Sequence, residues 1–301
     1  MKTIKYFLIA IIGIIAISCS NDNTTDPTGT LSLKLTDAPM HYGQFMTASV
    51  TIDKIEIGNS TNANSFVTVM NTQMKFNMLE LVNGITKSLA STPIPVGDYD
   101  MVRLYISDTQ MTLKNGTSFN YNMGQNGFSG NGMGMMQNGI ALNNDLRSID
   151  IKLDKILNIS TGTMKECLMD LDVANSFHLE GVAFSGSGSN MMMNMSGYTF
   201  SPTMRIVDMG NAGTITGTIH DATVNLPNAT VSLMHNGTLY TSTHTDANGN
   251  YTFIGIPQGT YTMSVELDGY SMNPIGNDQN SGAMNMMANG LLTVNFVMMH
   301  N

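Results

Sequence analysis

Methionine has the most unusual distribution of any residue in this sequence. The chain of 301 residues contains 28 methionines, and ten of them gather in three insertions rich in Gly and Asn, where core packing is not expected. Thioether sulfur is a soft ligand that favours Cu(I), and a flexible loop can bring three such sulfurs around one ion. The clusters therefore predict a Cu(I) site, with a reversible sink for oxidants, adaptable surface contacts and simple compositional drift as alternatives. The candidate ligands are Met133, Met135, Met136, Met191, Met192, Met193, Met195, Met284, Met286 and Met287.

Histidines show no arrangement that is typical of catalysis or zinc binding. They are scattered, with no HExxH motif and no close pair at zinc-ligand spacing. The sequence also lacks a GxSxG motif, a phosphate-binding P-loop and a dinucleotide fingerprint. We therefore predict that the protein is not an enzyme and, Cu(I) apart, needs no cofactor. The histidines are His41, His178, His220, His235, His244 and His300.

Two charged residues invite a functional interpretation, as a ligand-binding carboxylate and as an anion clamp. Asp37 comes just before Pro39 at the end of a strand pattern, where its side chain can cap backbone N–H groups of a turn. Arg103 is the outward residue of a strand that alternates apolar and polar side chains. Both are predicted to have structural roles.

The run TDANGNY has the spacing of a calcium loop at Asp246, Asn248 and Asn250. A calcium-binding EF-hand needs a glutamate at its twelfth position, and here that position is Pro257. We predict a polar hairpin turn that is closed by Gly249.

Cys167 lies in the alternating run ECLMDLDV, on the same side as Met169 and Leu171. The acidic residues of the run point the other way. A reactive thiol needs a nearby histidine or a helix N-terminus, and the sequence offers neither. Cys167 is predicted to be a small buried apolar residue.

The N-terminus has the three regions of an export signal. Lys2 and Lys5 precede an apolar run at residues 7–17, and small residues then lead to Cys19. This pattern resembles a bacterial lipoprotein signal, which is cut before the cysteine and leaves acyl chains on its thiol and amine. Each buried methylene contributes about 0.8 kcal/mol, so two or three chains hold a protein on a membrane. The apolar run is shorter than the ~20 residues that a spanning helix needs. We therefore expect a signal at residues 1–18 and lipidation of Cys19.

Residues 19–29 are polar, aperiodic and interrupted by Pro and Gly, which predicts a flexible tether. The SNDN that follows the cysteine resembles the export tags of surface lipoproteins in Bacteroidetes, and this implies an outer-membrane protein that faces the cell surface. Removing Lys2 and Lys5 with the signal changes the formal charge from -9 to -11. With no cluster of Lys or Arg, the chain is not expected to bind nucleic acid.

Residues 30–208 show a succession of strand patterns. TLSLKLTDAP, ASVTIDKIEIG, SFVTVM, DMVRLYIS, SIDIKL and CLMDLDV alternate apolar with polar residues, and a change of parity predicts a β-bulge near Asp53 and Lys54. One short helix is predicted around LELVNGITKSLAS, at residues 79–91. Two long insertions, at residues 122–139 and 185–197, are predicted to be unpacked loops. The block is expected to be a mainly antiparallel sandwich or barrel.

Several segments in this block carry a family resemblance. LSLKLTDAP, VTIDKIEI, LELVNG, PIPVGDYDMVRLYISD and YTFSPTMRIVD resemble, in that order, a domain of unknown function from bacterial and archaeal lipoproteins. The resemblance implies a β-rich envelope domain and no known reaction.

Residues 209–301 form a second block of short strand patterns that are separated by Asn-Gly, Gly-Asn and Pro turns. LPNATVSL, TDANGNYTF, IPQGTY and DGY resemble the carboxypeptidase regulatory-like domain, which implies a transthyretin-like sandwich without catalytic residues. The fold class is thus all-β, with two successive antiparallel β-sandwich or barrel domains and one short helix in the first. The predicted core of the second block is Val231, Leu233, Tyr251, Phe253, Tyr261, Met263, Val265, Val294 and Phe296.

Together these patterns predict a non-enzymatic, lipid-anchored envelope protein that serves in binding or adhesion. Carbohydrate is the expected ligand, by analogy with similar sandwiches. The first alternative is a methionine-rich lipoprotein that binds Cu(I) or scavenges oxidants. The second is a structural subunit of a surface assembly, whose sheet edges pair with a partner strand. The expected partners are the membrane, through the lipid, and a glycan or another envelope protein.

Overall fold

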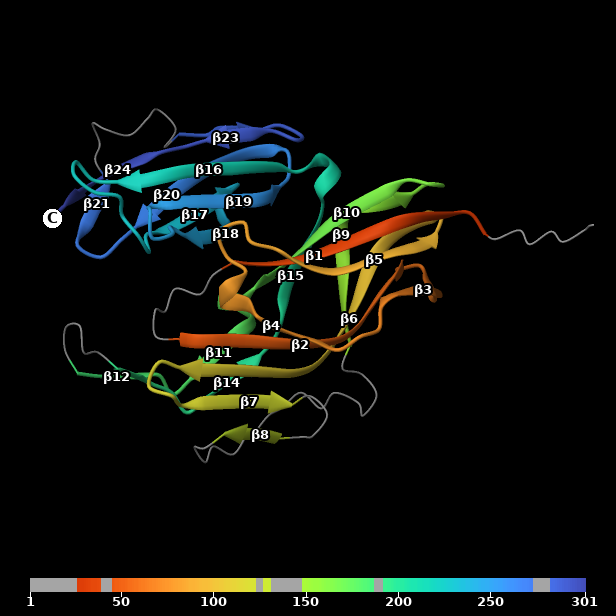
Figure 1. Cartoon of the computed structure of the whole chain (residues 1–301), viewed down its shortest axis with the longest axis horizontal. Coiled ribbons are helices and arrows are strands. Elements are labelled where there is room, and N and C mark those ends of the chain that lie inside the picture. The colour runs from red at the N-terminus through yellow and green to blue at the C-terminus, as the bar shows by residue number, and fades with distance from the viewer. Residues whose placement is uncertain (1–25, 39–44, 123–126, 131–147, 187–191, 273–281) are drawn as a thin grey trace, which may run out of the picture.

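The computed structural model describes residues 26–38, 45–122, 127–130, 148–186, 192–272 and 282–301 (Figure 1). These residues are organised around two hydrophobic cores. The first core draws its side chains from Leu31 to Ile206, and the second from Ile215 to Met298. Almost all of the regular structure is β-strand, which confirms the all-β prediction.

Two open sheets share the first core. Their strands are β1 (Thr28–Ala38), β2 (Phe45–Asn59), β3 (Asn62–Met70), β4 (Met74–Asn77), β5 (Lys87–Pro95), β6 (Gly97–Leu113), β7 (Ser118–Asn122), β8 (Gly127–Gly130), β9 (Ser148–Ile159), β10 (Met164–Asp172) and β15 (Thr203–Asp208). One sheet has the order β15-β10-β1-β5. The other has the order β3-β2-β6-β7-β8, with β4 also on β2 and β9 also on β6. Pairing is mainly antiparallel, although β1 and β10 are parallel.

Alternation of apolar residues explains how these strands face the core. Leu31, Leu33 and Leu35 of β1 are completely buried, as are Leu104 and Ile106 of β6. Because side chains alternate between the faces of a strand, the intervening residues point away from this core. The register between neighbouring strands then determines which of these outward-pointing side chains lie next to one another.

The predicted β-bulge in β2 is confirmed. Ile52 pairs with Ile106 and Lys54 pairs with Tyr105, so that Asp53 is the extra residue in β2. The bulge changes the parity of the strand, and this keeps Ile55 in the core while Lys54 stays on the outer face.

The predicted helix at residues 79–91 is wrong. A 3₁₀ turn at Met78–Glu80 is followed by a turn in which Asn83 and Gly84 have φ values of 58° and 77°. Two successive left-handed residues end any helix, and the chain continues directly into β5. The one short α-helix in the described part of the chain is α1 (Val173–Ser176), where Asp172 caps the N–H of Asn175. The first domain thus has its predicted short helix, but at another position.

The segment between α1 and β15 contains two small two-stranded sheets, and the strands of one lie between those of the other in sequence. Its strands are β11 (Phe177–Glu180), β12 (Ala183–Ser185), β13 (Met192–Asn194) and β14 (Gly197–Phe200). β11 pairs with β14, and β12 pairs with β13. The prediction of an unpacked loop at residues 185–197 is therefore wrong for its described part.

The second core is enclosed by two further sheets. The strands are β16 (Gly213–His220), β17 (Thr230–His235), β18 (Thr238–His244), β19 (Asn250–Ile256), β20 (Gly259–Glu266), β21 (Tyr270–Met272), β22 (Met284–Met286), β23 (Leu291–Thr293) and β24 (Phe296–His300). One sheet has the order β19-β16-β24-β21, with β23 on β16, and the other has the order β18-β17-β20-β22. All nine predicted core residues are buried. Figure 1 shows this domain beside the sheet that contains β1 and β10.

The turn between β18 and β19 is the predicted polar hairpin turn. Asp246 Oδ1 accepts the N–H groups of Asn248 and Asn250 at 2.8 and 2.9 Å. Gly249 has a φ of 74°, and an added Cβ there would lie 2.6 Å from the carbonyl oxygen of Ile219. These contacts account for the polar spacing without a bound ion.

Candidate ligand-binding face

The outer face of the sheet that contains β2 and β6 carries a row of charged and aromatic side chains. We call this group the outer row; it consists of Lys54, Glu56, Phe66, Arg103, Tyr105 and Asp150. Strand register brings its members together, because Glu56 pairs with Arg103, Arg103 pairs with Asp150, and Lys54 pairs with Tyr105. The row therefore crosses β2, β6 and β9, with Phe66 contributed by β3.

Glu56 is the centre of the outer row. Its Oε1 accepts a hydrogen bond from Lys54 Nζ at 2.8 Å, and its Oε2 accepts one from Tyr105 Oη at 2.9 Å. Partial burial would raise the pKa of Glu56, but the hydrogen bonds from Lys54 and Tyr105 outweigh it and lower that pKa. The bond to Glu56 also raises the pKa of Lys54. Both groups thus remain charged and fixed in position.

Arg103 forms a two-pronged ion pair with Asp150. Arg103 Nε lies 2.6 Å from Asp150 Oδ1, and Nη2 lies 2.9 Å from Oδ2. The hydrogen bond to Asp150 raises the pKa of Arg103 further above its ordinary value. The guanidinium also lies 4.0 Å above the centre of the Phe66 ring. Arg103 points outward, as predicted, but it is locked between three strands.

Cation–π contact also orders the other aromatic ring, because Lys54 Nζ lies 4.0 Å from the centre of the Tyr105 ring. At the bulge, Asp53 Oδ1 accepts hydrogen bonds from Ser107 Oγ at 2.8 Å and from Gln73 Nε2 at 2.7 Å. Hydrogen-bonded polar side chains therefore continue along the sheet beyond the outer row, at the bulge. The four charged side chains of the row are between 14% and 40% exposed, so a ligand can reach them.

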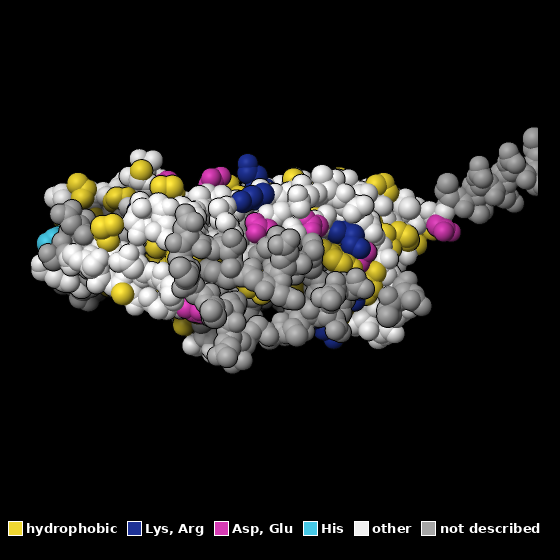
Figure 2. All heavy atoms as spheres, turned by 90° about the horizontal axis from the view of Figure 1, so that it is seen from below, with side chains coloured by type: hydrophobic (Ala, Val, Ile, Leu, Met, Phe, Trp, Pro, Cys, Tyr) yellow, Lys and Arg dark blue, Asp and Glu magenta, His cyan; other side chains and the backbone are white. Residues whose placement is uncertain are grey.

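The outer row has no net charge, because two cations pair with two carboxylates. Charged residues make up only 12% of the sequence. Figure 2 shows one face of the molecule on which charged side chains are sparse and positive groups lie beside negative ones. A surface of this kind offers directed hydrogen bonds without a strong electric field.

The methionine clusters behave differently from the prediction. Met133, Met135, Met136 and Met191 lie outside the described residues. Met193, Met195, Met284 and Met286 are buried in the two hydrophobic cores, so the expectation that core packing does not explain them is wrong. Met192 and Met287 are exposed. The Cu(I) site remains a prediction, with six of its ten proposed ligands described.

Strand alternation is the reason for this burial. β22 places Met284 and Met286 inward and Asn285 outward. The sulfur of Met286 rests against Gly213, where an added Cβ would lie 2.1 Å from it. The run Met-Asn-Met at 193–195 repeats the same pattern in the first domain. This period of two was the signal in the sequence that the insertions form strands.

The structure describes one of the two cysteines. Cys19 lies outside the described residues, so its lipidation remains a prediction. Cys167 is buried in the first core, as predicted. Burial raises the pKa of its thiol to about 12, so this thiol is protonated at neutral pH and is a poor nucleophile.

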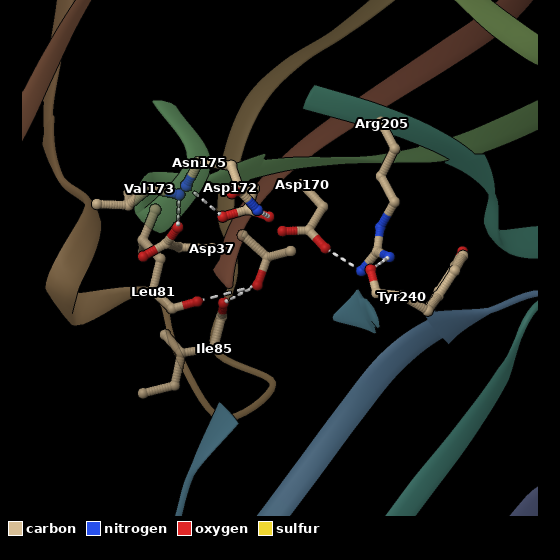
Figure 3. Close-up of polar contacts among 10 residues, drawn as sticks. Asp37, Leu81, Ile85, Asp170, Asp172, Val173, Asn175, Arg205 and Tyr240 are labelled. Atoms are coloured by element: carbon tan, nitrogen blue, oxygen red, sulfur yellow. Dashed lines mark hydrogen bonds and ion pairs between the residues drawn. The ribbon is translucent and has the colours of Figure 1, made fainter. Parts of the chain in front are cut away.

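Asp37 is buried beside the start of α1 (Figure 3). Its Oδ1 accepts the backbone N–H of Val173 at 3.2 Å, and its Oδ2 has no hydrogen-bond partner among the described residues. Burial, reinforced by the charge of Asp170, raises the pKa of Asp37 well above its usual range. A backbone N–H is its partner, as predicted, and this one comes from a residue 136 positions away. The turn that was predicted after Asp37 falls at residues 39–44, outside the described residues.

Arg205 links the two domains, as Figure 3 shows. Its Nη2 forms an ion pair with Asp170, and its Nη1 donates a 2.6 Å hydrogen bond to the carbonyl oxygen of Tyr240. The guanidinium also lies 4.0 Å from the centre of the Tyr240 ring. A second link is the 3.3 Å hydrogen bond from Asn83 Nδ2 to the carbonyl oxygen of Asn250. Arg205 thus joins β10 and β15 to the second domain, and Asn83 joins the turn before β5 to it.

Within the described ranges, no three His, Cys, Asp or Glu side chains are grouped so that they could hold a metal ion. Nor does any helix in that part of the chain have the length and apolar character needed to cross a membrane. Sequence reasoning singled out Arg103 but missed the rest of the outer row. The available signal was the alternation KIE in β2 and RLY in β6, although the register that joins them follows only from the fold.

Several solved structures are remotely similar to this chain. The Bacillus anthracis TIE protein is 13% identical, with 90% of this chain and 58% of that chain covered, at a TM-score of 0.26. A streptococcal ancillary pilin is 9% identical, with 90% and 62% covered, at 0.23. The shaft pilin SpaA of Lactobacillus rhamnosus GG is 10% identical, with 91% and 99% covered, at 0.23. The chain thus spans about three fifths of the length of the first two. No curated protein matches it.

Family models match both halves of the chain and confirm the two resemblances. The carboxypeptidase regulatory-like domain matches residues 214–286. The domain of unknown function DUF4382 matches residues 28–192, which is more than half of the chain. The protein therefore belongs to the DUF4382 family and carries a carboxypeptidase regulatory-like domain after the family domain.

Proposed function

We propose that this protein is a non-catalytic, lipid-anchored envelope protein that binds a neutral glycan on the outer row. The observation that supports this function is the locked, charge-balanced arrangement around Glu56 and Arg103. The lipid on Cys19 and the tether at residues 19–29 would hold the domains at the outer surface of the cell.

Pre-organisation is the first argument for binding. Each charged side chain of the outer row already has a hydrogen-bond partner, so little conformational entropy remains to be lost when a ligand arrives. Exposed ion pairs contribute only about 0–1 kcal/mol to stability, so stability alone gives little reason to gather them.

The chemistry of the row favours a polyhydroxylated, uncharged ligand. Sugar hydroxyls both donate and accept hydrogen bonds, and the row supplies carboxylate acceptors next to ammonium and guanidinium donors. A charged ligand would be repelled by a like charge beside each group that attracts it, because Lys54 adjoins Glu56 and Arg103 adjoins Asp150. The edges of Phe66 and Tyr105 add apolar surface for the C–H faces of a sugar ring.

The test is a screen of neutral glycans, followed by measurement of affinity with variants. Glu56→Gln removes the charge that orders both Lys54 and Tyr105, and it is expected to weaken binding about tenfold or more, as for loss of a charged hydrogen bond. Lys87→Gln on β5, an exposed charge on the other sheet, is the matched control and should bind normally. Absence of binding to any neutral glycan, or equal affinity of Glu56→Gln, would contradict the proposal.

A further inference from the structure

A cavity of about 180 Å³ lies where the two sheets of the first domain meet the second domain. β9 supplies Leu153 and Ile156, and β15 supplies Ile206. The buried thiol of Cys167 also lines it. Ala212 of the connecting segment and Pro257 of the turn between β19 and β20 complete an apolar wall. The cavity is therefore built from three parts of the chain that are far apart in sequence.

A large bulge in β9 opens this cavity. Tyr99 of β6 pairs with Leu157, and Met101 pairs with Lys152. One residue of β6 thus faces residues 153–156 of β9, which must bend away from the sheet. Ile156 is 66% exposed as a result, which is unusual for a large apolar residue in a strand. Bulges of this kind often aim side chains into binding sites.

The rim of the cavity carries an unbalanced positive group. Lys155 lines the cavity, and its ammonium forms no ion pair and no hydrogen bond with the described residues. Asp208 also lines the cavity, but its carboxylate is already paired, because Lys165 lies 3.7 Å from it and the N–H of Gly210 donates to it at 2.9 Å. A ligand that enters here therefore meets the ammonium of Lys155 and a wall that is mainly apolar, with Asn211 and Gln258 as its uncharged polar side chains.

We propose that this cavity binds a small carboxylate with an aromatic or branched-alkyl body. An apolar protein cavity of about 150 Å³ is large enough to bind benzene, so a single ring fits this one. The body would pack against Ile206 and Ala212, and the carboxylate would pair with Lys155 at the rim. This site is separate from the outer row and does not depend on glycan binding.

The test uses phenylacetate and the uncharged phenylacetamide as probes of the full-length chain. Binding of each probe is monitored through the methyl NMR signals of Ile156 and Ala212. Phenylacetate should shift these signals saturably, and phenylacetamide should bind at least threefold more weakly. Lys155→Gln should remove that difference. Lys152→Gln, an exposed lysine on the same strand that does not line the cavity, should leave it unchanged.

Filling the cavity gives a second, independent test. Ala212→Leu should abolish the shifts caused by both probes. If this variant does not fold, Ile156→Ala, a change at an exposed position, should lower the affinity for both probes at least threefold. Non-saturable shifts in the intact chain, equal affinity for the two probes, or binding that survives both cavity variants would overturn the proposal.

Discussion

Asp37 shows how a buried carboxylate can make stability depend on pH. Its pKa is raised in the folded protein, where Asp170, Asp172 and the Arg205 ion pair are the neighbouring charges. The unfolded chain releases this proton above about pH 4, while the folded chain retains it. The contribution of Asp37 to the free energy of unfolding must therefore fall as pH rises from about 4 through the folded-state pKa.

Asp37→Asn should remove this contribution. Asparagine keeps an oxygen for the N–H of Val173 and cannot ionise, so the variant should be at least as stable as the intact protein at pH 7. Its stability should also depend less on pH between 4 and 7. Urea denaturation across this range measures both effects, with the exposed Asp268→Asn as the control. A variant that is less stable at pH 7 and has an unchanged slope would show that Asp37 is ionised in the fold.

Cys167 should be chemically silent in the folded protein. With a pKa of about 12, only about one thiol in ten thousand is a thiolate at pH 8. Iodoacetamide should modify Cys167 only after unfolding, and mass spectrometry reads this directly. Rapid alkylation of the folded chain would mean that the thiol is reached and activated in a way that its burial does not explain.

Individual residues were predictable where they follow from alternation and less so where they depend on distant partners. Cys167 and the second core follow from the period of two, and all were placed correctly. Asp37 could not be paired with Val173 from sequence, because its partner lies 136 residues away. The outer row required the same kind of information, since register between strands decides which polar side chains meet.

At the scale of elements, β22 separates core methionines from surface ones. Met286 is buried and packs on Gly213, whereas the neighbouring Met287 is 72% exposed. Met286→Ala should lower the free energy of unfolding by about 2–5 kcal/mol. Met287→Ala should change it by no more than about 0.5 kcal/mol. Thermal or urea denaturation of this matched pair measures the difference, and equal small effects would show that β22 does not pack as described.

The failed helix prediction has a physical cause at the same scale. Apolar residues in LELVNG fit a helical period, but Asn83 and Gly84 adopt left-handed backbone angles that stop it. The backbone of residues 87–95 pairs with β1 instead, since Leu89 and Ile94 are buried there. Tertiary pairing thus overrides a weak local preference. In contrast, the bulge at Asp53 was predictable because a change of parity appears directly in the sequence.

At the scale of the whole molecule, Arg205 joins the two domains. No other Lys or Arg follows it in the sequence, so the second domain supplies no Lys or Arg that could replace it. Arg205→Ala would leave the buried Asp170 without its ion pair, at a cost of about 3–5 kcal/mol. We expect the domains of this variant to unfold in two separate thermal transitions.

Arg103→Ala provides a matched arginine control, because its partner Asp150 is 40% exposed whereas Asp170 is 7% exposed. Its ion pair is partly solvated, so the variant should lose about 1 kcal/mol or less and keep the transition pattern of the intact protein. Differential scanning calorimetry of the three proteins distinguishes the two roles. Identical unfolding profiles for Arg205→Ala and the intact protein would show that Arg205 does not couple the domains.

The domain plan could be predicted at this scale because each half of the chain has its own strand and turn patterns. The contact between the halves could not, because it depends on single side chains such as Arg205 and Asn83 that carry no periodic signal. Function follows the same division. The lipid anchor is predicted by local sequence, whereas the outer row exists only after β2, β3, β6 and β9 have paired.

The most direct test of the proposed function is a map of the amide NMR shifts caused by the best-bound neutral oligosaccharide. We predict saturable shifts concentrated at the outer row, around Glu56, Arg103 and Asp150, with an affinity that changes little with salt because the ligand is uncharged. Shifts confined to the second domain, or no saturable shift at any residue of the outer row, would contradict the assignment of this face as the glycan-binding site.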